Sequence, residues 1–212
     1  MRLKVCGMTS VEQIRELDYL GVEFCGLIFY PKSPRYVKKF HLSAIDLRNQ
    51  KMKINKVGVF VNADAEEVLR TVDLWRLEMV QLHGDETPKF CEKLSGYITT
   101  IKAIRVGPSE NIQRKLDQFA ESCDMFLFDT VGGQYGGTGE KFDWELLTKT
   151  DIPLPYFLSG GISPDDVDKL KEFQSASKNL FAIDANSRFE ISAGIKDMDK
   201  VGSFLKQFKD AT

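Results

Sequence analysis

The chain has 212 residues with a formal net charge of −2, and 42% of them are hydrophobic. This composition is ordinary for a globular protein, and the length suits one sizeable core, so we expect one domain spanning residues 1–212. The sequence shows no basic run, no signal-peptide pattern and no apolar stretch near the roughly 20 residues of a membrane span, which predicts a cytoplasmic protein without nucleic-acid or membrane partners.

Segments typical of strands and helices alternate along the chain. The predicted strands cover residues 3–7, 24–29, 56–61, 79–83, 98–105, 125–130, 156–162 and 180–184. The predicted helices cover residues 10–20, a weakly patterned stretch within 42–50, then 64–75, 86–94, 111–121, 143–148, 163–173 and 197–208. Eight such units of about 26 residues each predict an α/β fold, the (β/α)8 TIM barrel, whereas an open doubly wound sheet would have fewer units.

Motifs for common cofactors and metals are missing from the sequence. Neither the glycine-rich dinucleotide motif nor the P-loop motif is present, so we expect no cofactor. The four cysteines include no CxxC pair, and the two histidines belong to no set with the spacing of metal ligands, so we expect reduced cysteines and no metal.

The stretch 125–139 is the most informative part of the sequence. Four apolar residues run directly into Asp129, which predicts a buried strand that ends in a carboxylate. Five glycines follow within residues 132–139, and we expect this loop to close over a ligand. Ligands of parallel α/β folds bind at the carboxyl ends of strands, although an Asp that caps the next turn would explain Asp129 equally well.

Seven motifs occur in one order along the chain: KVCGMT (4–9), IFYPKSPRYV (28–37), VGVFV (57–61), VQLHGDE (80–86), FDT with GGTG (128–139), FDW (142–144) and LSGGISP (158–164). In this combination the sequence resembles the phosphoribosylanthranilate isomerase family of tryptophan biosynthesis. The resemblance implies an Amadori rearrangement of N-(5-phosphoribosyl)anthranilate to 1-(2-carboxyphenylamino)-1-deoxyribulose 5-phosphate, without a cofactor.

The resemblance also implies the catalytic pair. Cys6 matches the family's general base and Asp129 its general acid. Lys4 lies two residues before Cys6, so both side chains share one face of the strand, and a barrel-interior position would let Lys4 favour the thiolate. From its position alone, Cys6 would more often be a small core residue.

Four further residues match positions that line the family's substrate site. Arg35 matches an arginine near the anthranilate, where a guanidinium pairs with a planar carboxylate. Gln81, His83 and Asp184 match lining positions, and we assign His83 no proton transfer. The structural alternatives are an exposed loop arginine, a hydrogen-bonding histidine and an Asp that binds backbone amides.

The resemblance also implies a phosphate site, and there the chain departs from the family at one position. Gly160, Gly161, Asn186 and Ser187 match the loops that hold phosphate, although turns would need such residues anyway. Arg188 stands where the family commonly has Gly. Its guanidinium either contacts the phosphate or points to solvent, and the sequence leaves both open.

Three other functions fit a barrel of this size. A histidine-pathway phosphosugar isomerase would use two carboxylates, which disagrees with Cys6. A non-enzymatic phosphosugar-binding relative would have little need of Cys6 and Asp129 together. A structural or partner-binding barrel would have no reason to keep Arg35 and the glycine loops together. We therefore predict an isomerase with a phosphosugar–anthranilate substrate, acting as a monomer or homodimer.

Overall fold

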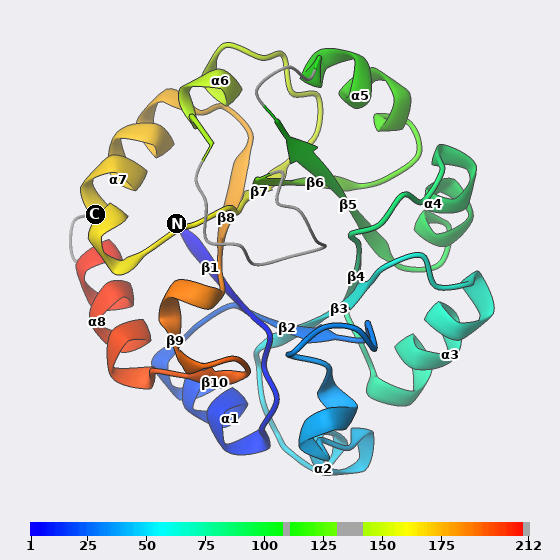
Figure 1. Cartoon of the computed structure of the whole chain (residues 1–212), viewed down its shortest axis with the longest axis vertical. Coiled ribbons are helices and arrows are strands. Elements are labelled where there is room, and N and C mark those ends of the chain that lie inside the picture. The colour runs from blue at the N-terminus through cyan, green and yellow to red at the C-terminus, as the bar shows by residue number, and fades with distance from the viewer. Residues whose placement is uncertain (108–110, 131–141, 210–212) are drawn as a thin grey trace.

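The computed structural model of the protein describes residues 1–107, 111–130 and 142–209. Eight parallel strands close into a barrel in chain order, with β8 paired to β1, and helices surround it (Figure 1). The strands are β1 Arg2–Cys6, β2 Phe24–Ile28, β3 Asn55–Phe60, β4 Met79–Leu82, β5 Thr99–Val106, β6 Met125–Thr130, β7 Tyr156–Leu158 and β8 Leu180–Ala185. The predicted (β/α)8 barrel is confirmed.

Each barrel strand is followed by a helix that packs on the outside. These helices are α1 Val11–Leu20, α2 Ala44–Arg48, α3 Ala65–Trp75, α4 Pro88–Ser95, α5 Ile112–Phe119, α6 Glu145–Thr148, α7 Val167–Ala176 and α8 Met198–Lys209. The weakly patterned helix within 42–50 is confirmed as α2. Of the helices in the described ranges, none is long and apolar enough to cross a membrane.

Local chemistry explains where the elements begin and end. The Ser10 side chain accepts a hydrogen bond from the backbone of Gln13 and so caps the start of α1. Gly21 ends the same helix in the left-handed conformation, with φ 76°. The Thr87 side chain caps the start of α4 as Ser10 caps the start of α1, and Pro88 follows directly.

The structure departs from the predicted elements on the segments after β7 and β8. The seventh strand ends at Leu158 rather than residue 162, because Gly160 and Gly161 adopt φ values of 91° and 68° that an extended strand excludes. A 3₁₀ turn, η2 Pro164–Asp166, precedes α7. After β8 the chain forms η3 Ser187–Phe189 and a small hairpin of β9 Glu190–Ser192 and β10 Ile195–Lys196, none of which the sequence predicted.

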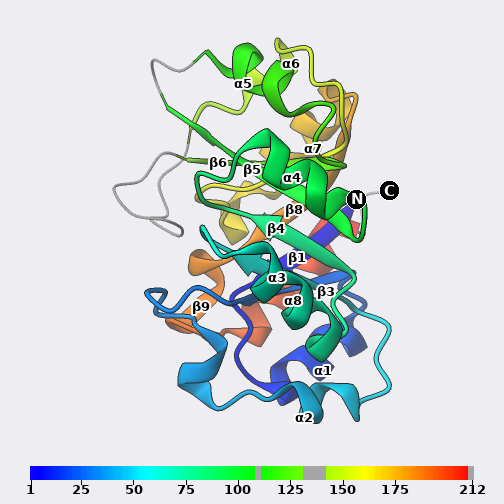
Figure 2. The same ribbon diagram turned by 90° about the vertical axis from the view of Figure 1, so that its right-hand side faces the viewer.

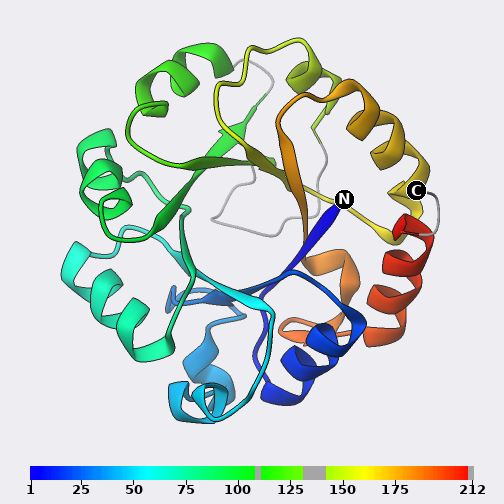
Figure 3. The same cartoon turned by 180° about the vertical axis from the view of Figure 1, so that it is seen from behind.

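The barrel interior contains an apolar layer and a polar layer. Residues of six strands form the apolar layer: Phe24, Val57, Ile101, Ala103, Met125, Leu127, Phe157 and Ala182. Toward the carboxyl ends of the strands lie buried polar side chains, including Lys4 and Gln81. Seen from the side, the N-terminus and β9 lie at opposite ends of the barrel (Figure 2). Figure 3 views the barrel from the end at which the N-terminus lies. The polar layer is therefore where we expect a functional site.

Candidate active site

Cys6 lies at the end of β1 and faces the barrel interior. Its side chain belongs to a small cluster with Ile28 and Val59, while Leu3 and Val5 of the same strand pack outward against the helices. Gly26 of β2 is its register partner, and a Cβ at Gly26 would lie 2.6 Å from the Cys6 Sγ. The absence of a side chain at this position therefore makes room for the thiol.

The charges around Cys6 act in opposite directions on its pKa. Burial raises the pKa of the thiol, the Lys4 ammonium lowers it, Asp184 raises it, and Lys196 and Arg35 lower it. The net result is a raised pKa. Lys4 thus favours the thiolate as expected, but burial outweighs it.

Cys6 should still be the most readily alkylated of the four cysteines, because it alone faces the polar end of the barrel. Burial raises the pKa of Cys25, Cys91 and Cys123 to about 12, 11 and 12, and all three pack in the layer between barrel and helices. Because the pKa of Cys6 is also raised, the iodoacetamide labelling rate should increase as pH rises above neutrality. Peptide mapping of labelled native protein measures this, and equal labelling of all four cysteines would contradict it.

A chain of buried polar contacts crosses the barrel from β1 to β6. The Lys4 ammonium lies 3.0 Å from Asp184 Oδ1 and donates to Gln81 Oε1 at 2.8 Å. Gln81 Nε2 lies 2.7 Å from His83 Nδ1, and His83 Nε2 lies 3.2 Å from Asp129 Oδ2. Four of the predicted site residues, Gln81, His83, Asp129 and Asp184, are thereby brought into one network.

Asp129 is held by donors on both carboxylate oxygens. The backbone N–H of Thr130 donates to Oδ1 at 2.9 Å, and His83 approaches Oδ2. Its register partner on β5 is Arg105, which pairs with Asp85. The carboxylate is thus fixed at the carboxyl end of β6, in the position expected of a group that acts on a ligand above the barrel.

Arg35 follows β2 and is fixed by a carboxylate that the sequence analysis did not identify. Its Nε and Nη2 groups donate to Glu190 at 2.7–3.1 Å in a bidentate pair. A Cβ at Gly7, which has φ 78°, would lie 2.6 Å from Arg35 Cδ, so that glycine leaves space for the arginine stem. The pair with Glu190 uses the Nε and Nη2 groups of the guanidinium, so a second carboxylate would have to pair with Nη1.

Glu190 also binds a buried lysine that the sequence analysis missed. Lys196 Nζ donates to Glu190 Oε1 and to Asn186 Oδ1, both at 2.8 Å. Burial raises the pKa of Glu190, but Arg35 and Lys196 outweigh it and the pKa is lowered. Burial lowers the pKa of Lys196 and Glu190 opposes that effect. The only sequence signal for this contact is the Gly194 turn, which places Glu190 and Lys196 opposite each other in the hairpin.

The four predicted phosphate residues lie on the adjacent segments after β7 and β8. Gly160 and Gly161 directly follow β7, and a Cβ at Gly160 would meet the Thr130 side chain at 2.5 Å. Asn186 precedes η3 and accepts a hydrogen bond from Lys196, and Ser187 begins the turn. The two segments thus place glycine backbone N–H groups and short polar side chains on adjacent segments, and backbone N–H groups are the donors that commonly bind phosphate.

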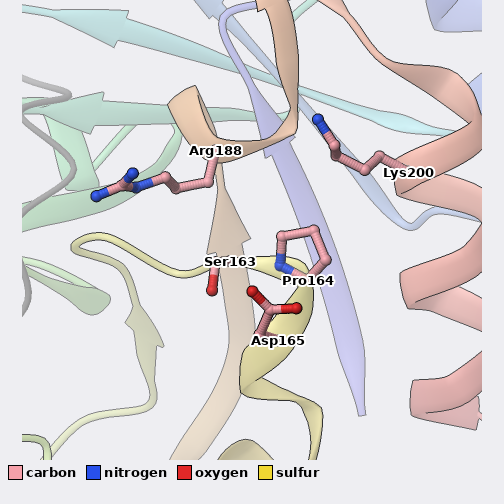
Figure 4. Close-up of a pocket in the computed structure, with 5 residues that line it drawn as sticks. All are labelled: Ser163, Pro164, Asp165, Arg188 and Lys200. Atoms are coloured by element: carbon pink, nitrogen blue, oxygen red, sulfur yellow. The ribbon is translucent and has the colours of Figure 1, made fainter.

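Arg188 lines a pocket of about 400 Å³ beside these segments. Figure 4 shows its side chain extending from the segment after β8, with Lys200 of α8 on the other side and Ser163 and Asp165 from the segment after β7. The Arg188 side chain is exposed. Since an exposed side chain that lines a pocket can either meet a ligand or point to solvent, the choice between the two alternatives stays a prediction.

The glycine-rich loop 132–139 lies outside the described residues, so its closure over the site stays a prediction. Across residues 1–107, 111–130 and 142–209, no group of three or more His, Cys, Asp or Glu side chains is placed to hold a metal ion.

The family model of N-(5′-phosphoribosyl)anthranilate isomerase matches residues 3–207. The chain belongs to the phosphoribosylanthranilate isomerase family. This membership removes the histidine-pathway isomerase as an alternative.

Relatives and solved structures in the phosphoribosylanthranilate isomerase family extend over nearly the whole chain. The isomerase of Parabacteroides distasonis is 38% identical over 209 residues, which are 98% of this chain and 93% of the relative. That of Azotobacter vinelandii is 37% identical over 211 residues, 100% and 98% of the two chains. The crystal structure of the Thermotoga maritima phosphoribosyl anthranilate isomerase has a TM-score of 0.85 at 33% identity, with 99% of each chain covered.

One solved structure of the phosphoribosylanthranilate isomerase family contains a ligand. It is a complex with reduced 1-(o-carboxyphenylamino)-1-deoxyribulose 5-phosphate, with a TM-score of 0.81, 31% identity and 99% of each chain covered. That ligand has an anthranilate carboxylate at one end and a phosphate at the other. In the present barrel, Arg35 lies beside the segment after β8, where it is bonded to Glu190.

Proposed function

We propose that this protein catalyses the Amadori rearrangement of N-(5-phosphoribosyl)anthranilate to 1-(2-carboxyphenylamino)-1-deoxyribulose 5-phosphate, with Cys6 as general base and Asp129 as general acid. The observation that carries the proposal is the polar chain from Lys4, beside Cys6, through Gln81 and His83 to Asp129. It connects a thiol and a carboxylate at the same end of one barrel. Family membership supplies the reaction.

The reaction needs one proton donor and one proton acceptor. Asp129 donates a proton to the furanose ring oxygen as the C1–O bond breaks and the nitrogen lone pair forms the Schiff base. The Cys6 thiolate then removes the proton from sugar C2, and the electrons of that bond form the enolamine, which tautomerises to the ketone. Asp129 must begin the reaction protonated and Cys6 must begin it ionised, so the site must hold the two groups in opposite protonation states.

The remaining predicted residues are assigned to binding. Arg35, oriented by Glu190, pairs with the anthranilate carboxylate, and Asp184 and Gln81 line the sugar pocket. One oxygen of Asp184, Oδ1, is buried and, within the described part of the chain, accepts no hydrogen bond of good geometry although Lys4 lies 3.0 Å away. Gly160, Gly161, Asn186 and Ser187 hold the phosphate.

The assembly of the enzyme is part of the same proposal. We take residues 1–212 as one catalytic domain, which the family match over residues 3–207 supports. It acts as a monomer or homodimer on the small-molecule substrate alone. One solved structure is described as monomers of the dimeric isomerase of Thermotoga maritima, so both forms are reasonable for this fold.

Turnover of the substrate tests the proposal directly. Purified protein should abolish the fluorescence of phosphoribosylanthranilate with multiple turnovers, and the gene should restore growth of a tryptophan auxotroph that lacks this step. The Asp129→Asn variant is the matched control and should consume the substrate roughly 10² times more slowly. Binding of the substrate without turnover would instead indicate a non-enzymatic phosphosugar-binding protein and contradict the proposal.

Replacing Arg188 by Ala should change KM by less than about fivefold, the equivalent of the 1 kcal/mol or less that an exposed charge contributes. The phosphate is then held by backbone amides and short side chains. Steady-state kinetics of Arg188→Ala and Arg188→Gly measure the effect. A KM increase of about tenfold or more, at unchanged kcat, would show that the guanidinium contacts the phosphate directly.

A further inference from the structure

The orientation of the Gln81 amide is decided by Lys4. The Lys4 side chain is fully buried, and burial lowers its pKa, but Asp184 and Cys6 outweigh this and the pKa is raised, so the group is an ammonium. An ammonium only donates hydrogen bonds. The atom of Gln81 that lies 2.8 Å from it must therefore be the amide oxygen, and the NH₂ group must point the other way.

The Gln81 amide in turn decides where His83 carries its proton. The NH₂ group only donates, and it lies 2.7 Å from His83 Nδ1. Nδ1 must therefore accept, so it has no hydrogen and the ring proton is on Nε2. That nitrogen faces Asp129 Oδ2 at 3.2 Å and donates to it.

We propose that Lys4 is a positioning residue that, through Gln81, holds His83 as the neutral Nε2–H tautomer facing Asp129. A proton on Nδ1 would require the Gln81 amide to turn over. Its NH₂ group would then face the Lys4 ammonium, which places two donors together in a fully buried site. The unmade hydrogen bond to a charged group opposes that arrangement.

The consequence for catalysis rests on the proposed function. A general acid must be protonated at the start of the reaction, and an imidazolium beside Asp129 would favour the ionised carboxylate instead. A neutral Nε2–H orients the carboxyl group without adding a positive charge. Among the described residues, the charged groups near this pair include Asp184, which is matched by Lys4, and Arg105, which is matched by Asp85.

The tautomer can be read directly by ¹⁵N NMR of the histidine rings. The chain has only two histidines, and His41→Asn leaves His83 as the sole signal. Asn suits the left-handed backbone of position 41, where φ is 57°. We expect an unprotonated Nδ1 and a protonated Nε2 at neutral pH. A protonated Nδ1 would overturn the proposal, whether or not the protein is active.

Gln81→Glu is the variant that reverses the arrangement. A carboxylate at position 81 still pairs with Lys4 but can only accept from His83, so Nδ1 should gain a proton and the ring become an imidazolium at neutral pH. Lys4→Met, which removes the fixed donor, should give a mixture of both tautomers. If both variants fold, as judged by circular dichroism, and keep the native tautomer, Lys4 does not set it and the proposal is wrong.

Kinetics then separate this positioning role from a structural one. In Gln81→Glu, the alkaline limb of the kcat profile should move to lower pH, because an imidazolium makes Asp129 lose its proton more readily. An unmoved limb, with an altered tautomer, would overturn the catalytic consequence. If native protein shows the expected tautomer but no turnover, the proposed function fails while the structural assignment stands.

Discussion

Cys6→Ala and Asp129→Asn, each made alone, should lower kcat by roughly 10² or more, the contribution typical of one general acid or base. Each side chain is proposed to move one proton, and neither substitution removes a group assigned to binding. Affinity for the reduced product analogue should therefore stay nearly unchanged. Single-turnover assays and titration with the analogue measure the two quantities separately.

Cys25→Ala is the matched control for the thiol. Cys25 is also fully buried and also on a barrel strand, but it packs in the layer between strands and helices, on the far side of β2 from the polar network. It should keep turnover close to that of the unchanged protein. Near-normal turnover of Cys6→Ala would show that Cys6 is not the base, and the same result for Asp129→Asn would remove the acid assignment.

Glu190→Ala should lower the free energy of unfolding by about 3–5 kcal/mol, the usual cost of removing one partner of a buried ion pair. The Glu190 side chain is only 5% exposed and is bonded to both Arg35 and Lys196. Its loss leaves two buried cations facing each other without a carboxylate. Urea denaturation of the variant and the unchanged protein measures the difference.

Two comparisons make the Glu190 experiment specific. Glu145→Ala removes an ion pair with Lys149 in which both side chains are more than 70% exposed, and it should change stability little. The lowered pKa of Glu190 means that its charge stabilises the fold above its ordinary pKa of 4.5, and that this contribution is lost as pH falls below that value. A loss in Glu190→Ala no greater than in Glu145→Ala would show that the cluster is not stabilising.

The barrel and part of the site could be predicted from the sequence because they depend on local sequence patterns. The alternation of strand and helix patterns predicted eight units, and the two-residue spacing of Lys4 and Cys6 predicted that both face one side. The structure confirms that this side is the interior. Caps such as Ser10 and stops such as Gly21 depend only on neighbouring residues, so they too were readable.

The parts that the sequence did not predict are long-range contacts and short irregular segments. Glu190 contacts Arg35 across 155 positions of the chain, and no local pattern encodes such a pair. The β9–β10 hairpin is too short for periodicity to indicate it. The net pKa of Cys6 was also beyond reach, because it is a balance between burial and three cations that only the folded chain brings together.

The pairing of β1 with β8 has a consequence for the order in which the enzyme folds during synthesis. Cys6 and Lys4 lie on the first strand made, whereas Asp184, Glu190 and Lys196 lie near the end of the chain. Closing so long a segment is entropically costly and slow, so the barrel seam should be among the last contacts to form. A nascent or truncated chain that stops before β8 would contain helices and a partial sheet but no environment for the thiol. Activity should therefore arise in one late event, when the two ends of the polypeptide meet.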